Sequence, residues 1–435
     1  MTDKQIMNIR KDFPWFKNNR GWHYLDSSAT SLKPKCVLKK ENEYYEVFGC
    51  SPHNNDSLFA YKTHGLIKES RELLASFVGR IPEEIIFTSG ATESLNLISL
   101  GLTKFVKNND EIILTYAEHT SNLLPWFRLS KQTKSKIVWV GKNKIPNEKD
   151  ILKAITKKTK IVTFCDVSNI LGYYIDCVSL TKKIKKINPN IIVVVDATQS
   201  VPHLKHNLKN TDVDFMVFSA HKMLGPTGVG VCFMNKKWIE KLEPLKLGGG
   251  MNALVLPKNN EFTFASGVDK FEGGTPNTAG IIGFGEAIKY LNKIGWDNIE
   301  NHDRELKEYF DKKSSSIKNF EYYTKDSKTP ICPICKTSLC ISNSGNIYPC
   351  EGWQSMSLGN IKNQSLREIW EESPKVRNLR ELTYGHFHKC NSCQDKNFCT
   401  PCLIMNANEN PAGDYYKINP LICEIARIKK EVYYL

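Results

Sequence analysis

Short apolar runs rich in β-branched residues recur between residues 84 and 234, and helical patterns separate several of them. The runs read "EIIFT", "EIILTY", "KIVWV", "KIVTFCD", "IIVVVD", "VDFMVFS" and "GVGVCFM". Stretches such as "LIKESRELLASFVG" repeat their apolar residues at helical spacing. Continuous apolar strands that alternate with helices predict an α/β domain, doubly wound around a mainly parallel sheet that is buried on both faces.

The size of the chain and the distribution of its cysteines predict two modules. A chain of 435 residues with 41% hydrophobic residues can bury one large core and a smaller one. Nine of the 14 cysteines lie between Cys332 and Cys423. A polar stretch that ends in proline, "YYTKDSKTP" at 322–330, precedes this cluster. We therefore expect one domain over residues 1–325 and a cysteine-rich domain over 331–435.

Composition excludes two classes of partner. The longest strongly apolar run, "IIVVV", is too short to cross a bilayer, and the N-terminus lacks an apolar leader, so we expect a cytoplasmic protein with no membrane partner. The formal net charge is +14. The lysines are scattered over polar faces, as in "LTKKIKKINPN", and no binding motif accompanies them, which argues against a nucleic-acid partner.

Polar residues that follow the predicted strands are candidates for chemistry, because parallel sheets bind ligands at the carboxyl ends of their strands. After the first run comes "SGATES", in which Gly90 permits a turn while Ala91 and Thr92 open a helix suited to a phosphate. After the sixth run comes "SAHK", which contains Ser219, His221 and Lys222. The remaining polar candidates that follow strands are His119, Asn169, Asp196 and Gln199.

Each of these residues has an ordinary structural explanation on its own, but the set has a common chemical meaning. A phosphate cradle, an aromatic histidine, an aspartate, a glutamine and a lysine would meet in one crevice. Together they are the parts needed to hold a phosphorylated aromatic aldehyde and to form a Schiff base with it.

Residues from about 20 to 325 resemble the class V aminotransferase family of pyridoxal 5'-phosphate (PLP) enzymes, and most closely its cysteine desulfurase branch. This resemblance implies a fold type I PLP-dependent transferase domain with a mainly parallel seven-stranded sheet. The motifs that carry it are, in order, "YLDSSATSLKP", "FTSGATES", "EHTSNLLPW", "VSNILG", "VVVDATQSVPH", "VFSAHKMLGPTGVG" and "FEGGTPNT".

The resemblance also implies a role for each candidate. Lys222 would form the internal aldimine, His119 would stack on the ring, and Asp196 would pair with the pyridine nitrogen. Gln199 would bond the ring hydroxyl, and Asn169 would lie near the substrate. The residues implied to hold the phosphate are Ala91, Thr92, Ser219, His221 and, from the neighbouring subunit of a homodimer, Thr275.

The chain departs from the desulfurase branch in two places. That branch carries a nucleophilic cysteine and a carboxylate-binding arginine in a C-terminal small domain, which has no counterpart here. Asn54 and Asn55 also stand where the family usually has a histidine, arginine and glycine run. Persulfide chemistry of the family type is therefore in question, and the sequence assigns neither Arg377 nor Arg380 to the substrate carboxylate.

The cysteine-rich module has a recognisable spacing. Its second half reads C-x2-C-x5-C-x2-C before a final cysteine, and its first half contains C-x12-G-x4-C. With "SNSGNIYPC" and "LGNIKNQSLREIW", this resembles the SPASM domain, although the usual third spacing is one residue longer. In a reducing compartment such a cluster indicates metal rather than disulfides. The candidate ligands are Cys332, Cys335, Cys340, Cys350, Cys390, Cys393, Cys399, Cys402 and Cys423.

The SPASM resemblance implies [4Fe-4S] clusters, two in the favoured interpretation, with zinc as the alternative metal. One cluster would take Cys390, Cys393, Cys399 and Cys423. The other would take Cys332, Cys350, Cys402 and either Cys335 or Cys340. The radical-initiating C-x3-C-x2-C motif is absent from the sequence. The clusters could be structural, exchange electrons with a donor, bind a peptide partner or accept sulfur.

The favoured function is a PLP enzyme of the cysteine desulfurase or C–S lyase type, acting on a small amino acid, with cysteine as first choice. The sulfur acceptor would be the spare thiol of the second module or Cys50, and simple elimination would need none. An aminotransferase or epimerase in peptide or metabolite modification is one alternative. A non-catalytic iron–sulfur carrier or docking protein is another.

Overall fold

The computed structural model describes residues 1–52, 57–142, 145–314, 326–332, 334–336, 339–342, 344–350, 352–399 and 401–434. Asn54 and Asn55 lie outside these residues. Contacts divide the chain into a first unit, Met1–Phe310, and a second unit, Asp311–Leu435. The predicted boundary at 325 falls in the segment 315–325, which is also outside the described residues.

A seven-stranded sheet forms the centre of the first unit, with strand order β1-β7-β6-β5-β4-β2-β3. Its strands are β1 (Ile85–Thr88), β2 (Glu111–Thr115), β3 (Lys136–Val140), β4 (Thr159–Cys165), β5 (Ile192–Asp196), β6 (Phe215–Ser219) and β7 (Gly230–Met234). Strands β2 to β6 pair in parallel, whereas β7 is antiparallel to both β1 and β6. The predicted α/β fold with a mainly parallel sheet is confirmed.

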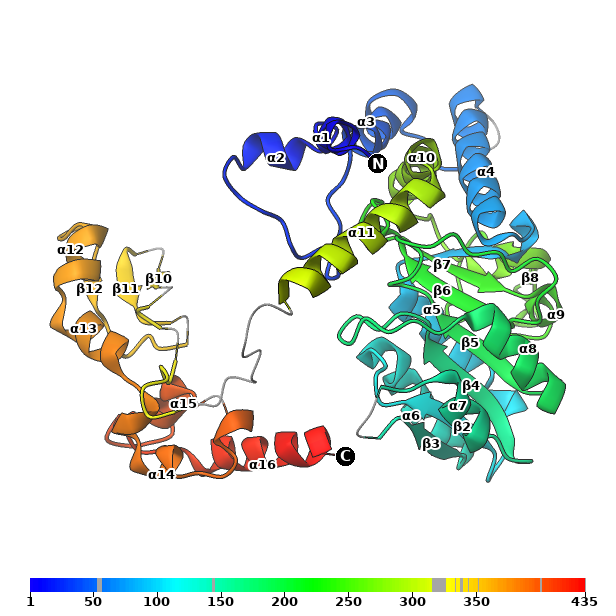
Figure 1. Ribbon diagram of the computed structural model, residues 1–435. Coiled ribbons are helices and arrows are strands. Elements are labelled where there is room, and N and C mark those ends of the chain that lie inside the picture. Colours follow the sequence, from blue (N-terminus) through cyan, green and yellow to red (C-terminus); the bar gives the residue numbers. More distant parts are fainter. Residues whose placement is uncertain are drawn as a thin grey trace. The chain divides into compact units, whose positions relative to one another are not determined.

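Helices cover both faces of this sheet (Figure 1). Alternate strand residues face opposite sides: Val193 and Val195 of β5 join one core, and Ile192 and Val194 join the other. The first core packs against α4, α7, α8 and α10, and the second against α5, α6 and α9. The helices are α1 (Asp3–Arg10), α2 (Pro14–Asn18), α3 (Lys35–Glu43), α4 (Leu58–Val78), α5 (Ala91–Gly101), α6 (Leu124–Thr133), α7 (Glu148–Ala154), α8 (Cys177–Ile187), α9 (Lys236–Ile239), α10 (Thr278–Ile294) and α11 (Trp296–Ser314).

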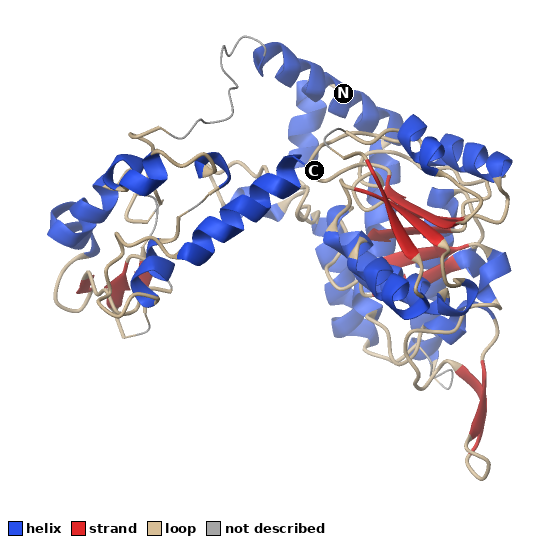
Figure 2. Cartoon of the chain, turned by 90° about the horizontal axis from the view of Figure 1, so that it is seen from below, coloured by secondary structure: helices blue, strands red, loops and turns tan. Residues whose placement is uncertain are grey.

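A largely buried ion pair ties α4 to the segment that follows a hairpin. The hairpin consists of β8 (Asn252–Leu256) and β9 (Glu261–Phe264) and projects from the first unit in Figure 2. The two guanidinium nitrogens of Arg71 lie 2.8 Å from the two carboxylate oxygens of Glu272. Glu272 also accepts a bond of 2.7 Å from the amide of Phe87 in β1. The pair therefore anchors the loop that leads to Thr275.

Replacing Arg71 by methionine is expected to destabilise the first unit by about 3–5 kcal/mol, because Glu272 would keep a buried charge without its partner. Urea unfolding measures this change. The matched control is Lys289→Met, which breaks the exposed Lys289–Glu69 pair of 2.6 Å. That pair should contribute at most about 1 kcal/mol. Equal losses of unfolding free energy in the two variants would contradict the conclusion that the Arg71–Glu272 pair stabilises the fold more than the exposed pair does.

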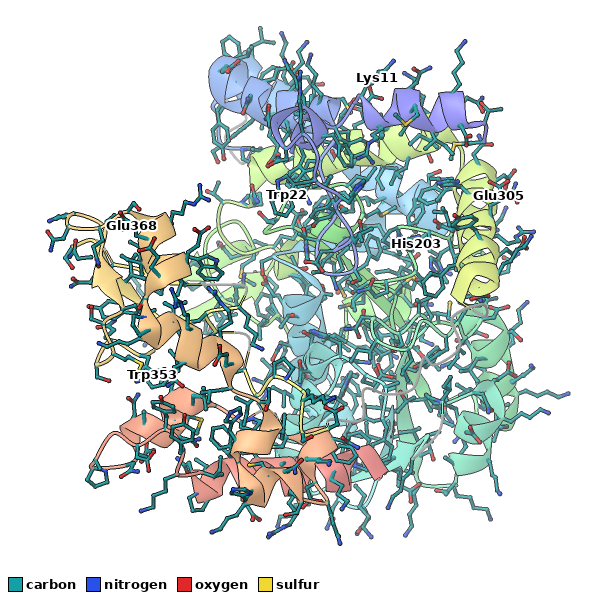
Figure 3. The ribbon with its side chains drawn as sticks, turned by 60° about the vertical axis from the view of Figure 1, so that its left-hand side comes forward. Lys11, Trp22, His203, Glu305, Trp353 and Glu368 are labelled. Atoms are coloured by element: carbon teal, nitrogen blue, oxygen red, sulfur yellow. The ribbon has the colours of Figure 1, made fainter. Side chains whose placement is uncertain are left out.

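The second unit is small and combines short strands with short helices. Its core contains Trp353, labelled in Figure 3, together with Tyr384 and Ile347. Its elements are β10 (Cys340–Ile341), β11 (Asn346–Tyr348), β12 (Gly359–Asn360), α12 (Leu366–Glu372), α13 (Pro374–Glu381), α14 (His388–Asn391), α15 (Leu403–Asn408) and α16 (Pro420–Tyr434). Within the described parts of both units, none of the helices has the length and apolar character that crossing a membrane requires.

Candidate functional site

A cavity of about 100 Å³ lies at the carboxyl ends of the central strands. Nine of the ten residues that the sequence assigns to a cofactor line it: Ala91, Thr92, His119, Asn169, Asp196, Gln199, Ser219, His221 and Lys222. The tenth, Thr275, lines a separate pocket of about 170 Å³ together with Gly273 and Gly274. The structure thus brings the strand-end candidates together and places Thr275 apart from them.

An amine and a carboxylate face this cavity from neighbouring strands. Lys222 ends the short 3-10 turn η5 (Ala220–Lys222) after β6, and Asp196 is the last residue of β5. Burial lowers the pKa of Lys222 while the charge of Asp196 raises it. Burial raises the pKa of Asp196, opposed by bonds from Thr198 and by the charges of Lys222 and His119. The site therefore favours a cation beside Asp196 and keeps the lysine amine available as a nucleophile.

The bonds to Asp196 leave part of its carboxylate available. The amide of Thr198 donates to Oδ1 at 3.1 Å, and the Thr198 hydroxyl donates to the same oxygen at 2.5 Å. Among the described residues, these bonds fix the carboxylate through one oxygen only. The second oxygen can accept a proton-bearing ring nitrogen, which is the contact that a pyridinium cofactor requires.

The start of α5 forms the end of the cavity that suits an anion. The amide of Ala91 donates to the hydroxyl of Ser219 at 2.9 Å, so the start of α5 and the end of β6 meet here. Strand β7 approaches closely here, and a Cβ on Gly230 would lie 2.4 Å from the Cα of Gly90. Only glycine permits this approach. The free amides and dipole of an 11-residue helix at this position suit a phosphate.

His119 is oriented by its neighbour. The amide of Ser121 donates to Nδ1 of His119 at 3.2 Å, so the neutral ring carries its proton on Nε2. Glu118 lies buried behind it and accepts bonds from Thr115 at 2.6 Å and from Asn122 at 2.7 Å. Burial raises the pKa of Glu118 to about 7. These bonds hold the loop that presents the imidazole.

The raised pKa of Glu118 predicts a pH-dependent stability. The folded form holds the proton more tightly than the unfolded chain, whose pKa is 4.5. The stabilisation is therefore complete below pH 4.5 and is lost as the pH rises through about 7. Glu118→Gln cannot ionise, so at pH 8 it should gain up to about 3 kcal/mol over the parent.

Urea unfolding at pH 5 and pH 8 checks this expectation. The difference between Glu118→Gln and the parent should grow with pH. The control is Glu83→Gln at an exposed position, whose free energy of unfolding should stay within about 0.5 kcal/mol of the parent's. A constant difference for Glu118→Gln would contradict the assigned titration.

The sequence did not assign four further residues that line the cavity: Ser121, Cys165, Val167 and Thr198. Cys165 is buried, and its sulfur lies 3.2 Å from the hydroxyl of Tyr173. Cys165 pairs in register with Asp196 across β4 and β5, so strand alignment was the signal that could have identified it.

A buried polar cluster lies next to the cavity strands. The hydroxyl of Ser200 lies 2.7 Å from Asp166 Oδ2 and 2.8 Å from His206 Nε2, and Cys177 lies 4.0 Å from the other ring nitrogen. Burial raises the pKa of Asp166 to about 8 and lowers that of His206 to about 4. A protonated carboxyl and a neutral imidazole form a hydrogen-bonded network that carries no net charge at neutral pH.

The second unit contains a cavity of about 390 Å³ that is lined by four cysteines: Cys390, Cys393, Cys399 and Cys423. This is the set that the SPASM resemblance assigns to one cluster. The amide of Asp395 donates to the sulfur of Cys393 at 3.4 Å. Four thiols that line one cavity, with an amide donor to one of the sulfurs, suit an iron–sulfur centre.

A second group of cysteines gathers around Cys332. Burial raises the pKa of the Cys332 thiol, and the nearby Cys402 and Cys350 raise it further. Cys332 also lies close enough to Cys335 to raise the pKa of the Cys335 thiol. Cys340 instead lies in β10, opposite Tyr348 of β11. The arrangement favours Cys335 over Cys340 as the companion of the other three.

Neither arginine that the sequence left unassigned is a free cation. Arg380 donates to the carbonyls of Cys335 and Trp370, each at 2.8 Å. Arg377 donates to the carbonyl of Glu371 at 3.2 Å. Both side chains therefore support the backbone of the second unit. Among the described residues, the lining of the first-unit cavity includes no arginine.

Family models match both units. The model described as "Aminotransferase class-V" matches residues 23–341, and the SPASM model, an iron–sulfur cluster-binding domain, matches residues 313–395. Curated relatives are named "Probable cysteine desulfurase". The one from Ureaplasma parvum is 47% identical over 320 residues, covering 73% of this chain and 79% of the relative. The one from Mycoplasma genitalium is 39% identical, covering 74% and 80%.

Solved structures agree with the sequence relatives. An apo cysteine desulfurase from Thermococcus onnurineus has a TM-score of 0.67 and 34% identity, covering 71% of this chain and 76% of that one. The cysteine desulfurase CsdA from Escherichia coli has a TM-score of 0.61 and 30% identity, covering 68% and 73%. The chain therefore belongs to the class V aminotransferase family and is a PLP-dependent enzyme of the cysteine desulfurase-like type.

Proposed function

We propose that the chain removes sulfur from L-cysteine, using PLP bound through the amine of Lys222. The observation that carries this proposal is that Lys222 and Asp196 line one cavity whose other end is the start of α5. The relatives named as cysteine desulfurases support the choice of substrate.

The residues present fit this cofactor. Asp196 would hold the pyridine nitrogen, and His119 would pack on the ring. Ala91, Thr92, Ser219 and His221 would hold the phosphate, and Gln199 and Asn169 would face the ring edge. Bound there, PLP would supply an electron sink for bonds at the substrate α-carbon. Lys222 would then move protons to and from that carbon.

Sulfur removal needs an acceptor thiol. The acceptor sulfur would attack the cysteine sulfur, forming an S–S bond as the C–S bond breaks, and the remaining carbon skeleton would take up protons and leave as alanine. Candidate acceptors are Cys335, Cys50 and Cys340, the last being the thiol left over if Cys335 completes the group around Cys332. Simple loss of hydrogen sulfide would leave all three thiols dispensable.

The second unit would hold two [4Fe-4S] clusters. Supporting this are the cavity of four cysteines, the group around Cys332 and the SPASM match at residues 313–395. Zinc bound by the same thiolates remains the alternative metal. The chain would act as a homodimer, in which Thr275 reaches the partner's phosphate, since Thr275 lies in a separate pocket of its own chain.

The experiment is anaerobic purification with iron, sulfide and PLP quantitation, followed by an amino-acid panel scored for product. Alanine from cysteine, with persulfide on the protein or with sulfide once a thiol reductant is added, supports the proposal. Keto acids from another amino acid would instead identify an aminotransferase, and no spectral response to any amino acid would identify a carrier protein. Replacing Cys340, Cys335 and Cys50 singly then identifies the acceptor.

A further inference from the structure

An N-terminal segment contacts the turn that carries Lys222. The carbonyl oxygen of His221 accepts the Ser31 amide and the Ser31 hydroxyl, each at 2.9 Å, and the Lys33 ammonium at 3.0 Å. The Thr30 hydroxyl lies 3.2 Å from the same oxygen. This carbonyl belongs to the peptide bond that joins His221 to Lys222. We name Thr30, Ser31 and Lys33 the clamp.

Four donors surround the carbonyl oxygen of His221, which has only two lone pairs to accept hydrogen bonds. The Lys33 ammonium also contacts the carbonyl of Ser31 and, at 3.3 Å, the hydroxyl of Thr30. Burial lowers the pKa of Lys33 to about 8, against the opposing charge of Glu41. Partial burial of the ammonium costs desolvation free energy. Its charge-assisted hydrogen bond to the carbonyl oxygen of His221 offsets this cost.

The clamp also holds the other side of the turn. The amide of Leu224 donates to the Ser31 hydroxyl at 2.8 Å. Leu224 has φ of 59°, in the left-handed region that a leucine seldom occupies. The same hydroxyl therefore bonds the backbone before and after Lys222. Such an unfavourable conformation persists only where the surroundings hold it.

A further contact extends from the same segment into the cavity. The side-chain amide of Gln199 donates to the carbonyl of Ser28 at 2.9 Å. Residues 28–33 thus bond both Gln199 and the backbone around Lys222, two parts of the site that come from different strands.

We propose that Thr30, Ser31 and Lys33 are positioning residues, which fix the peptide bond before Lys222 and thereby aim its amine at the cofactor. This rests on the proposed role of Lys222. The side chains of the clamp would not touch the reacting atoms. Loosening the clamp would leave the amine in place but let it adopt several directions.

The test uses the holoenzyme and the variants Ser31→Ala and Lys33→Met. Both should release bound PLP at least about fivefold faster into a competing apo-protein, because a misdirected amine holds the cofactor less well. Both should also weaken the visible circular dichroism of the bound cofactor, which reports its fixed orientation. Ser31→Thr and Lys33→Arg keep the hydroxyl and the charge and should restore both readouts.

The matched control is Lys39→Met, which removes the same charge from an exposed position in α3. It should behave as the parent does. If Lys33→Met and Ser31→Ala match this control while the parent holds PLP on Lys222, the clamp has no positioning role. If the parent itself holds no PLP on Lys222, the proposed function fails instead. Should Ser31→Ala fail to fold, the comparison of Lys33→Met with Lys33→Arg decides.

Discussion

Replacing Lys222 by alanine is expected to lower the turnover of L-cysteine by about 10³-fold or more, because one side chain supplies both the covalent attachment and the proton transfer. Lys222 is half-buried and follows β6 directly. Truncating it should leave the fold intact, since the core beneath is formed by Phe215, Val217 and their neighbours. Alanine formation from cysteine, measured anaerobically, checks the expectation.

The control for this variant is Lys182→Ala, which removes an exposed lysine from α8. Its turnover should equal that of the parent. Lys222→Ala should also lose the visible absorbance of bound PLP, and its unfolding midpoint in urea should match that of the parent prepared without PLP. Turnover within tenfold of the parent would contradict the catalytic role of Lys222.

Replacing Cys423 by serine is expected to remove one metal centre from the second unit. Cys423 lines the cavity with Cys390, Cys393 and Cys399. If each of the two cysteine groups holds a [4Fe-4S] cluster, iron and sulfide should fall from about eight to about four per chain. The metal centre would join the segments that carry Cys390 and Cys423, so without it the resistance of the second unit to proteolysis should fall as well.

Two cysteine variants serve as controls for this loss. Cys36→Ser changes a half-buried thiol of the first unit and should leave iron and sulfide unchanged. Cys340→Ser should also leave them unchanged if Cys335 completes the group around Cys332. Zinc in place of iron, without acid-labile sulfide, would contradict the cluster proposal but not the ligand set. Unchanged metal in Cys423→Ser would contradict the ligand set itself.

Much of the first unit could be predicted from local sequence pattern. All seven apolar runs are strands of one sheet, and all but the partly exposed edge strand β3 alternate their side chains between two largely buried faces. Nine cofactor candidates line one cavity, because strand ends in a parallel sheet meet at one edge. Periodicity does not encode strand direction, however, so the antiparallel pairing of β7 with β1 and β6 could not be read from it.

The parts that escaped prediction depend on contacts between distant residues. Ser31 and Lys33 lie in a polar loop without periodicity. His221 lies about 190 positions later in the sequence, so only the folded chain brings these residues into contact. Likewise, the spacing of the cysteines in the sequence could not decide between Cys335 and Cys340 as the fourth ligand of the second cluster. In the structure the nearby Cys332 raises the pKa of Cys335, whereas Cys340 pairs in β10 with Tyr348 of β11.

The most direct test of the account is to reduce the purified holoenzyme with borohydride, digest it and locate the modified residue by mass spectrometry. The account predicts one pyridoxyl phosphate group, attached to the ε-amine of Lys222. A protein prepared with ample PLP that carries no such group, or carries it on a different lysine, would contradict the assignment of Lys222 and the catalytic mechanism built on it.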